Sequence, residues 1–349
     1  AMIFGLVSLM FLDTSINMAM QPFKMMVGDM VNEKQKGLAY SIQSFLCNAG
    51  SLVGFLFPFI FTWIGISNIA PQGVVPDSVI YSFYIGAAIL ILCVIYTTVK
   101  VKEMPPAEYA EYHGITEEEK KEKINMVKLL VKAPKAFWTV GLVQFFCWFA
   151  FMFMWTYTNG SVAANVFDAP TVETVVNGAN KVVLDTKSIQ YQNAADWVGV
   201  LFAVQAIGSV LWAVCIPMFK NRKLIYSLSL VLGGIGFIST YFVHNQYVLF
   251  ISFLLIGCAW AAMLALPFTI LTNALSGGHM GTYLGLFNGT ICIPQIVAAT
   301  LGGSILALFT PKGMLPPEIN MLVMAGVMLI IGAVCVYLIK ETKGEQAKT

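Results

Sequence analysis

Long apolar runs dominate the pattern of hydrophobic and polar positions along the chain. Nine of these runs are long enough, at about 1.5 Å of rise per residue, to cross a hydrocarbon layer of roughly 30 Å as α-helices. They cover residues 1–27, 38–64, 79–99, 137–158, 196–219, 224–242, 247–275, 281–309 and 320–339. The pattern therefore predicts an all-α membrane protein with nine transmembrane helices.

Positively charged residues divide unevenly between the connections of these spans. Of the 20 Lys and Arg residues, 17 lie in alternate connections that include 100–136 and the carboxyl-terminal tail, whereas the opposite set holds only Lys181, Lys187 and Lys312. Lys and Arg concentrate in cytoplasmic loops. We therefore expect the amino end outside and the carboxyl end in the cytoplasm, which agrees with an odd number of spans.

The longest cytoplasmic connection, 100–136, has two interpretations. Ile124, Val127 and Val131 fall on one helical face, which favours an interfacial helix lying along the membrane between two halves of the protein. A solvated, charged linker explains the composition equally well.

The longest outer loop, 159–195, carries alternating Val residues on both sides of Asn177-Gly178. Asn-Gly between alternating apolar residues is typical of a two-residue β-turn. The sequence therefore predicts a short hairpin in this loop.

An internal repeat indicates how the spans are grouped. The stretch MAMQPFKMMV near the end of the first span resembles MLALPFTILT in the seventh, which aligns Pro22-Phe23 with Pro267-Phe268. This spacing fits the parallel halves of a six-plus-six transporter, although chance similarity between apolar sequences is the alternative. On the first interpretation, 1–99 is the second part of the amino-terminal half (helices four to six of twelve), 100–136 is the linker, and 137–349 is the carboxyl-terminal half.

Composition supports a membrane protein and excludes several other classes. The chain is 58% hydrophobic and 11% charged, against roughly 25% charged for a soluble domain. A net charge of +2 without a basic cluster argues against nucleic acid as a partner. All seven Cys lie in apolar runs without the spacing of metal ligands, and no nucleophile or phosphate-loop motif indicates an enzyme. We expect a monomer in the lipid bilayer.

Asp13 is the only acidic residue in the interior of a long apolar run. A charged carboxylate at that depth costs about 3 kcal/mol or more, so we expect Asp13 to be sheltered and functional. Asn17 and Gln21 follow one and two helical turns later on the same face, as candidate substrate ligands. Lys24 and Asp29, near the cytoplasmic end, are either a gate pair or a solvated surface pair.

Polar and aromatic side chains form a second stripe in the fourth span. Gln144, Trp148 and Trp155 follow at intervals of four and seven, which places an amide and two indoles on one side of a helix. Amides hydrogen-bond sugar hydroxyls, and an aromatic ring stacks on the apolar face of a pyranose. Trp residues near helix ends also form interfacial belts, which we favour for Trp155. Further candidate ligands, each with helix packing as the alternative, are Asn48, Gln205, Asn288 and Gln295.

The first span resembles the fourth-helix signature of the sucrose and maltose branch of the glycoside-pentoside-hexuronide:cation symporters, within the major facilitator superfamily. The matching residues are Asp13, Asn17, Gln21, Pro22, Lys24, Gly28 and Asp29. Helix order extends the resemblance over the whole chain, with Ala195-Asp196-Trp197 opening the fifth span. The resemblance implies a role for Asp13 in proton coupling. Two departures are Lys24, where Arg is commoner, and the absence of the first three helices, so that nine of twelve would be present.

These observations predict a secondary active transporter of the cytoplasmic membrane that carries a disaccharide such as sucrose or maltose together with a proton. No cofactor is expected besides the proton as coupling ion. Two alternatives stay open: a sodium-coupled sugar or glycoside symporter, and a membrane sensor that binds sugar without moving it.

Overall fold

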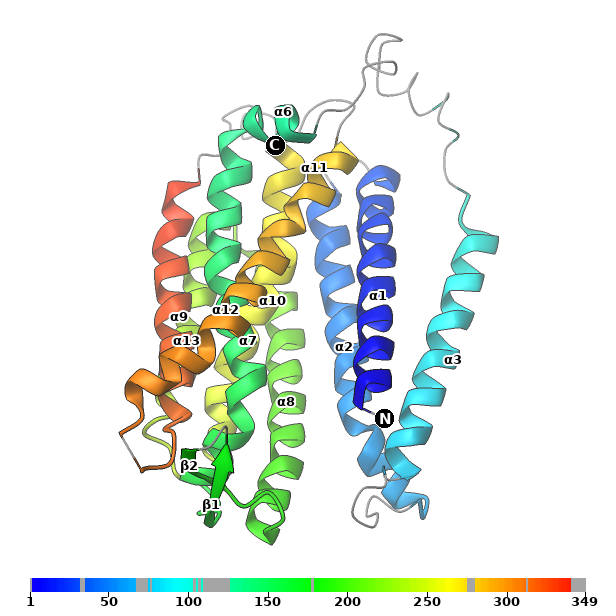
Figure 1. The fold of residues 1–349 in the computed structure, drawn as a ribbon. Helices are drawn as coiled ribbons and strands as arrows, with labels where there is room; N and C mark the ends of the chain where they lie inside the picture. Colours follow the sequence, from blue (N-terminus) through cyan, green and yellow to red (C-terminus); the bar gives the residue numbers. More distant parts are fainter. Residues whose placement is uncertain are drawn as a thin grey trace.

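The computed structural model describes residues 2–31, 35–66, 75, 77–102, 105, 108, 126–176, 179–274, 280–311 and 313–339, and the structural statements below refer to these residues (Figure 1). The amino-terminal helices are α1 (Met2–Met30), α2 (Lys36–Trp63) and α3 (Asp77–Lys100), followed by the short α6 (Met126–Val131). The remaining helices are α7 (Lys135–Asn165), α8 (Ile189–Cys215), α9 (Arg222–Ser239), α10 (Leu249–Ala274), α11 (Met280–Phe287), α12 (Gly289–Phe309) and α13 (Ile319–Cys335).

The described helices match the predicted spans closely. Eight helical spans in this part of the chain are long and apolar enough to cross a membrane, and the 28-residue α2 fills the remaining predicted span. The fold class, an all-helical bundle with eight or nine candidate membrane helices, is therefore confirmed.

One boundary of the predicted spans is wrong. The fifth helix begins at Ile189 rather than near Ala195, because Ser188 caps it by accepting a hydrogen bond from the Tyr191 amide at 3.3 Å. The predicted span 281–309 is present as Gly281–Phe309, in which the single residue Asn288 separates α11 from α12.

The predicted hairpin is present in the outer loop. β1 (Thr171–Val176) pairs antiparallel with β2 (Ala179–Leu184), and the pair closest to the turn is Val176 with Ala179. The turn residues, Asn177 and Gly178, lie outside the described residues. In Figure 1 the hairpin lies at one end of the bundle, and α6 and α11 lie at the other. α6, from a connection with many positive charges, and the hairpin, from one with few, thus lie at opposite ends of the bundle (Figure 1).

Helices α7 to α13 form a closely packed bundle of their own. α10 packs against α8 and α9, and α13 packs against α7 and α9. α8 and α10 approach so closely that a Cβ atom on Gly208 would lie 2.5 Å from the Leu254 carbonyl oxygen, and one on Gly257 would overlap the Gln205 carbonyl. Small residues allow this approach in membrane helices, where dispersion contacts replace the hydrophobic effect as the driving force.

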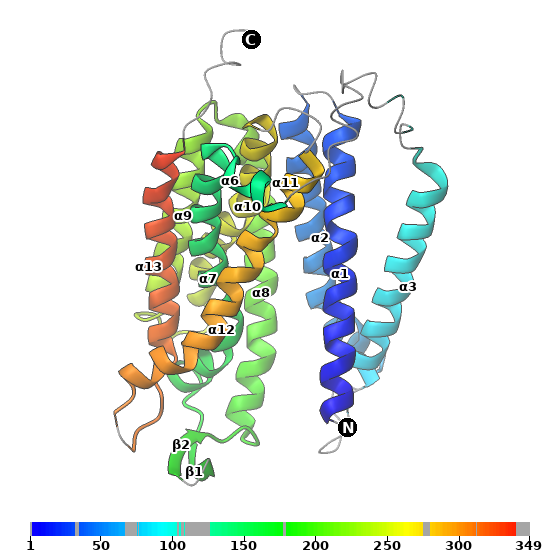
Figure 2. The ribbon, with the colours of Figure 1, turned by 45° about the horizontal axis from the view of Figure 1, so that its top comes forward.

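The amino-terminal helices join this bundle mainly through α2, which packs against α8 and α10. Tyr40 of α2 stacks on Phe268 of α10 with ring centroids 6.3 Å apart, and Phe55 meets Phe202 of α8 at 5.9 Å. α1 contacts α2 and α11, while α3 lies at the outer edge in both ribbon views (Figure 2).

Only part of the predicted interfacial helix is described. α6 spans Met126–Val131, and the rest of the predicted stretch before it lies almost entirely outside the described residues. Val127 and Val131 are exposed on α6, as an apolar face turned toward a membrane surface requires. α6 also meets α11, where the Tyr283 hydroxyl donates to the Leu129 carbonyl at 3.3 Å.

Candidate functional site

Asp13 lies on α1 with an exposed side chain, so the expectation that it would be sheltered is wrong for the described structure. The physical reason is that the described contacts of α1 are concentrated on α2 and on α11. The Asp13 carboxyl nevertheless interacts electrostatically with the Cys292 thiol of α12. It therefore faces the carboxyl-terminal bundle across the boundary between the two groups of helices.

The other predicted residues of α1 give less information. The Asn17 side-chain amide donates to the Asp13 backbone carbonyl at 3.0 Å, so this hydrogen bond is made within α1. Gln21, Lys24 and Asp29 belong to α1, but their side chains lie outside the described residues. The gate pair is still a prediction.

Asn288 occupies the interruption between α11 and α12. Its amide nitrogen lies 3.8 Å from the Cys292 sulfur, to which it donates, and its Oδ1 atom is buried without a hydrogen-bond partner. Gln295 follows on α12 and is partly buried. Asn288 and Asp13 therefore flank the same thiol from two different helices.

α7 brings Gln144 close to this region. A Cβ atom on Gly141, one turn before Gln144, would lie 3.0 Å from the Thr290 methyl group of α12. Gln144 is 1% exposed, and its amide donates to the Met263 carbonyl of α10 at 2.9 Å. Its Oε1 atom has no partner. The hydrogen bond fixes the amide between α7 and α10 and leaves a buried acceptor free.

Three indoles form a cluster near Gln144. Trp148 and Trp155 lie one and three turns further along α7, and Trp260 lies on α10. The Trp148 and Trp260 ring centroids are 5.8 Å apart, Trp155 and Trp260 are 5.7 Å apart, and Trp148 and Trp155 are 6.4 Å apart. The Trp148 indole nitrogen is buried without an acceptor. Trp155 is 43% exposed and its ring also packs on the other two, so its place in an interfacial belt is still a prediction.

Sequence reasoning missed Trp260 and Cys292. Trp260 lies in the middle of the apolar run 247–275, away from either end, and this position distinguishes it from a belt residue. Cys292 gave no usable signal, because all seven Cys lie in apolar runs. Its place between Asp13 and Asn288 is a property of the tertiary structure.

The structure does not bring Asn48 and Gln205 into this cluster. Both are buried. The Asn48 amide donates to the Ser44 carbonyl at 2.7 Å, and its Oδ1 atom has no partner. Gln205 lies where α8 touches α10, with its backbone carbonyl against Gly257. No hydrogen bond or ring contact of the described residues joins either side chain to Gln144 or Trp148.

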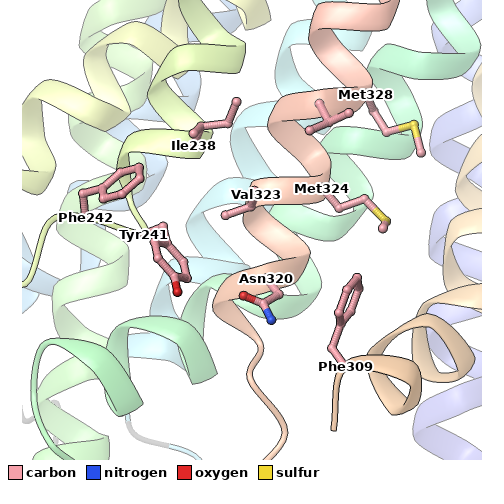
Figure 3. Close-up of a pocket in the computed structure, with 9 residues that line it drawn as sticks. Ile238, Tyr241, Phe242, Phe309, Asn320, Val323, Met324 and Met328 are labelled. Atoms are coloured by element: carbon pink, nitrogen blue, oxygen red, sulfur yellow. The ribbon is translucent and has the colours of Figure 1, made fainter.

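A cavity of about 570 Å³ lies elsewhere, at the outer surface of α9 and α13 (Figure 3). Its lining residues are Ile238, Tyr241, Phe242, Phe309, Asn320, Val323, Met324, Val327 and Met328. Only the Tyr241 hydroxyl and the Asn320 amide are polar, and none of the predicted site residues takes part. This apolar groove is therefore separate from the polar site.

The candidate polar residues thus lie on helices of a membrane bundle, with Asp13 and Asn288 on either side of Cys292. The sequence model of the Major Facilitator Superfamily matches residues 3–179 and 162–349, which together include almost the whole chain. The chain belongs to the Major Facilitator Superfamily. It is a multi-pass membrane protein and a secondary transporter rather than an enzyme, with a small-molecule substrate. A search of curated proteins finds no match.

Proposed function

We propose that this transporter carries a neutral disaccharide, such as sucrose or maltose, in symport with a proton. The observation that carries the proposal is three of the buried polar atoms that have no partner among the described residues: Gln144 Oε1 and Trp148 Nε1 on α7, and Asn288 Oδ1 between α11 and α12. A buried group without a partner costs about 1 to 3 kcal/mol, and native proteins keep few of them. Such atoms are therefore expected to bind a ligand or ordered water.

The chemistry of these atoms favours hydroxyl groups. Gln144 and Asn288 offer acceptors and Trp148 offers a donor. A hydroxyl donates and accepts at once, so a polyol satisfies both kinds. The rings of Trp148 and Trp260 meet edge to face, and a free ring face there would supply aromatic surface for the C–H side of a sugar ring. This combination of amides and indoles is typical of sugar recognition.

The distribution of charge favours a neutral substrate and an acidic coupling group. Asp13 is the only charged residue among the candidate residues with described side chains, and it interacts with Cys292 beside Asn288. If protonation of Asp13 and sugar binding favour the same conformation, each strengthens the other by the same free energy. One proton moving down 100 mV gains about 2.3 kcal/mol, enough for roughly fifty-fold accumulation of a neutral sugar.

Uptake by proteoliposomes tests the proposal directly. The protein is reconstituted, and radiolabelled sucrose, maltose and a monosaccharide are offered at several values of external pH, with and without a sodium gradient. We expect disaccharide accumulation that requires an inward proton gradient and is indifferent to sodium. Accumulation that follows sodium instead, or sugar binding without any uptake, would contradict proton symport.

A further inference from the structure

A carboxyl group at the outer end of the bundle has a role that the sugar site does not explain. Glu318 immediately precedes α13, in the connection from α12 that the charge distribution assigns to the outside. A carboxylate at a helix start usually accepts hydrogen bonds from the first amides. The Glu318 side chain makes no such bond.

The Glu318 carboxyl lies instead on the backbone of α7 at Gly160. A Cβ atom at position 160 would overlap both carboxyl oxygens and the carbon between them. The carboxyl therefore has this place only because residue 160 is a glycine. Contact with the helix backbone removes water from one side of the acid and supplies no cation in return.

The groups that surround this contact carry little compensating charge. On α7, Tyr157 is the titratable residue that interacts electrostatically with Glu318. Tyr241, two residues after the end of α9, lines the same apolar groove as Asn320. The described end of α12 adds no charged residue, and Lys312 of the same connection lies outside the described residues. Burial raises the pKa of Glu318 from 4.5 to about 7.

We propose that Glu318 is a proton-binding site on the outer face, and that its protonated form holds the start of α13 against α7. The neutral acid lies on Gly160 without the desolvation cost of a charge, whereas the ionised form is more stable in water. The contact of the Glu318 carboxyl with Gly160 is therefore fully favoured below the ordinary pKa of a free glutamate. It is lost as pH rises through the higher pKa that Glu318 has in this contact. Because α13 packs along α7, external acidity would tighten this part of the bundle. The proposal is independent of the identity of the transported substrate.

Infrared difference titration of the protein in lipid nanodiscs tests the proton site. The carboxyl signal that disappears in Glu318→Gln reports Glu318 alone, and we expect its midpoint close to pH 7. Gly160→Ala places a methyl group where the Glu318 carboxyl lies, and it should weaken proton binding by at least tenfold. Gly303→Ala is the matched control, because a Cβ atom at Gly303 meets no atom within 4 Å.

Several outcomes would overturn the proposal. One is a wild-type midpoint in the ordinary range of a solvated glutamate, and another is a midpoint that Gly160→Ala leaves unchanged. A low midpoint that rises in Lys312→Gln would show an ion pair in place of a proton site. If Gly160→Ala does not fold, Glu318→Asp, whose shorter side chain withdraws the carboxyl from Gly160, is expected to shift the midpoint in the same direction.

Hydrogen exchange tests the consequence for α13. The amides in the first two turns of α13 are compared between wild type and Glu318→Gln at each pH, which cancels the intrinsic dependence of exchange on pH. We expect the wild-type rate relative to Glu318→Gln to rise at least tenfold between pH 5 and pH 8. A ratio that stays constant over this range would show that protonation does not hold the helix.

Discussion

Helices α3 and α10 have the same hydropathy and very different surroundings. The spans Asp77–Lys100 and Leu249–Thr272 both have a mean hydropathy of 2.4, yet 6% of the first and 67% of the second is buried inside the protein. In a bilayer, lipid tails solvate an apolar side chain as well as protein does. Hydropathy therefore predicts which segments enter the membrane and says little about which of them pack together.

Close packing follows small residues rather than apolar ones. Gly257 allows α10 to touch the α8 backbone, whereas Gly86, the glycine of α3, has no atom within 4 Å of a Cβ position. Bulky residues such as Phe83 and Tyr84 make up much of the surface of α3 and are exposed. The carboxyl-terminal bundle thus forms its own core, and α3 presents its side chains to the surroundings.

Matched phenylalanine substitutions should separate the two regions most clearly. Phe253 of α10 is 1% exposed and Phe83 of α3 is 68% exposed. Phe253→Ala leaves a cavity in a packed core, so we expect a loss of on the order of 3 kcal/mol in the free energy of unfolding. Phe83→Ala should change it by about 0.5 kcal/mol or less. Reversible unfolding in mixed micelles measures both, and equal losses would mean that α3 packs as tightly as α10.

The amino-terminal helices should matter for coupling rather than for stability. Asp13→Asn mimics the protonated acid, so we expect the variant to bind and exchange sugar while losing the accumulation that a proton gradient drives. At 100 mV this loss corresponds to about 2.3 kcal/mol. Counterflow and gradient-driven uptake in the same proteoliposomes separate the two activities. Wild-type accumulation with normal pH dependence in Asp13→Asn would remove Asp13 from the coupling mechanism.

Glycine substitutions test the same difference in packing between α10 and α3, with a smaller expected change in stability. Gly257→Ala places a methyl group against the Gln205 carbonyl and 2.7 Å from the Ser209 amide nitrogen, so α8 and α10 must separate. Overpacking of this kind costs about 2 kcal/mol. Gly86→Ala meets open space and should be neutral or slightly stabilising, because alanine is the better helix former. Thermal unfolding of both variants in one detergent gives the difference, and a stable Gly257→Ala protein would argue against the close contact.

Sequence patterns predicted the helices and the hairpin of this fold better than they predicted which helices pack together. The predicted spans and the hairpin depend on local periodicity and composition, and the structure contains them. The start of α8 was misplaced because the side-chain amides of Gln190, Gln192 and Asn193 interrupt the apolar pattern, although residues 189–195 are helical.

The candidate site shows the same limit. The stripe of Gln144 and Trp148 could be predicted from helical spacing, because both residues lie on one helix. Trp260 on α10 and Cys292 on α12 belong to other helices, and their neighbours Trp148 and Asp13 are given only by the tertiary structure. The environment of Asp13 depends on neighbours of α1, so its apolar sequence context alone suggested a shelter that the described residues do not provide.

The last prediction concerns the candidate site inside the carboxyl-terminal bundle, where binding should be sensitive to one aromatic ring. Trp148 is half-buried, its ring centroid lies 5.8 Å from that of Trp260, and its indole nitrogen has no acceptor. Trp138, at the exposed start of α7, makes an edge contact with Phe137 and lies outside the cluster.

Trp148→Ala should weaken sugar binding by about 1.5 kcal/mol, the scale of losing an aromatic contact, and Trp138→Ala should leave it unchanged. Isothermal titration with the sugar identified by uptake gives both affinities, and the unfolding temperature of each variant shows whether the bundle is intact. Trp148→Phe keeps a ring and removes the donor, so it divides the effect between stacking and hydrogen bonding. Unchanged affinity in a folded Trp148→Ala protein would assign this indole to helix packing, and the free nitrogen would then bind water.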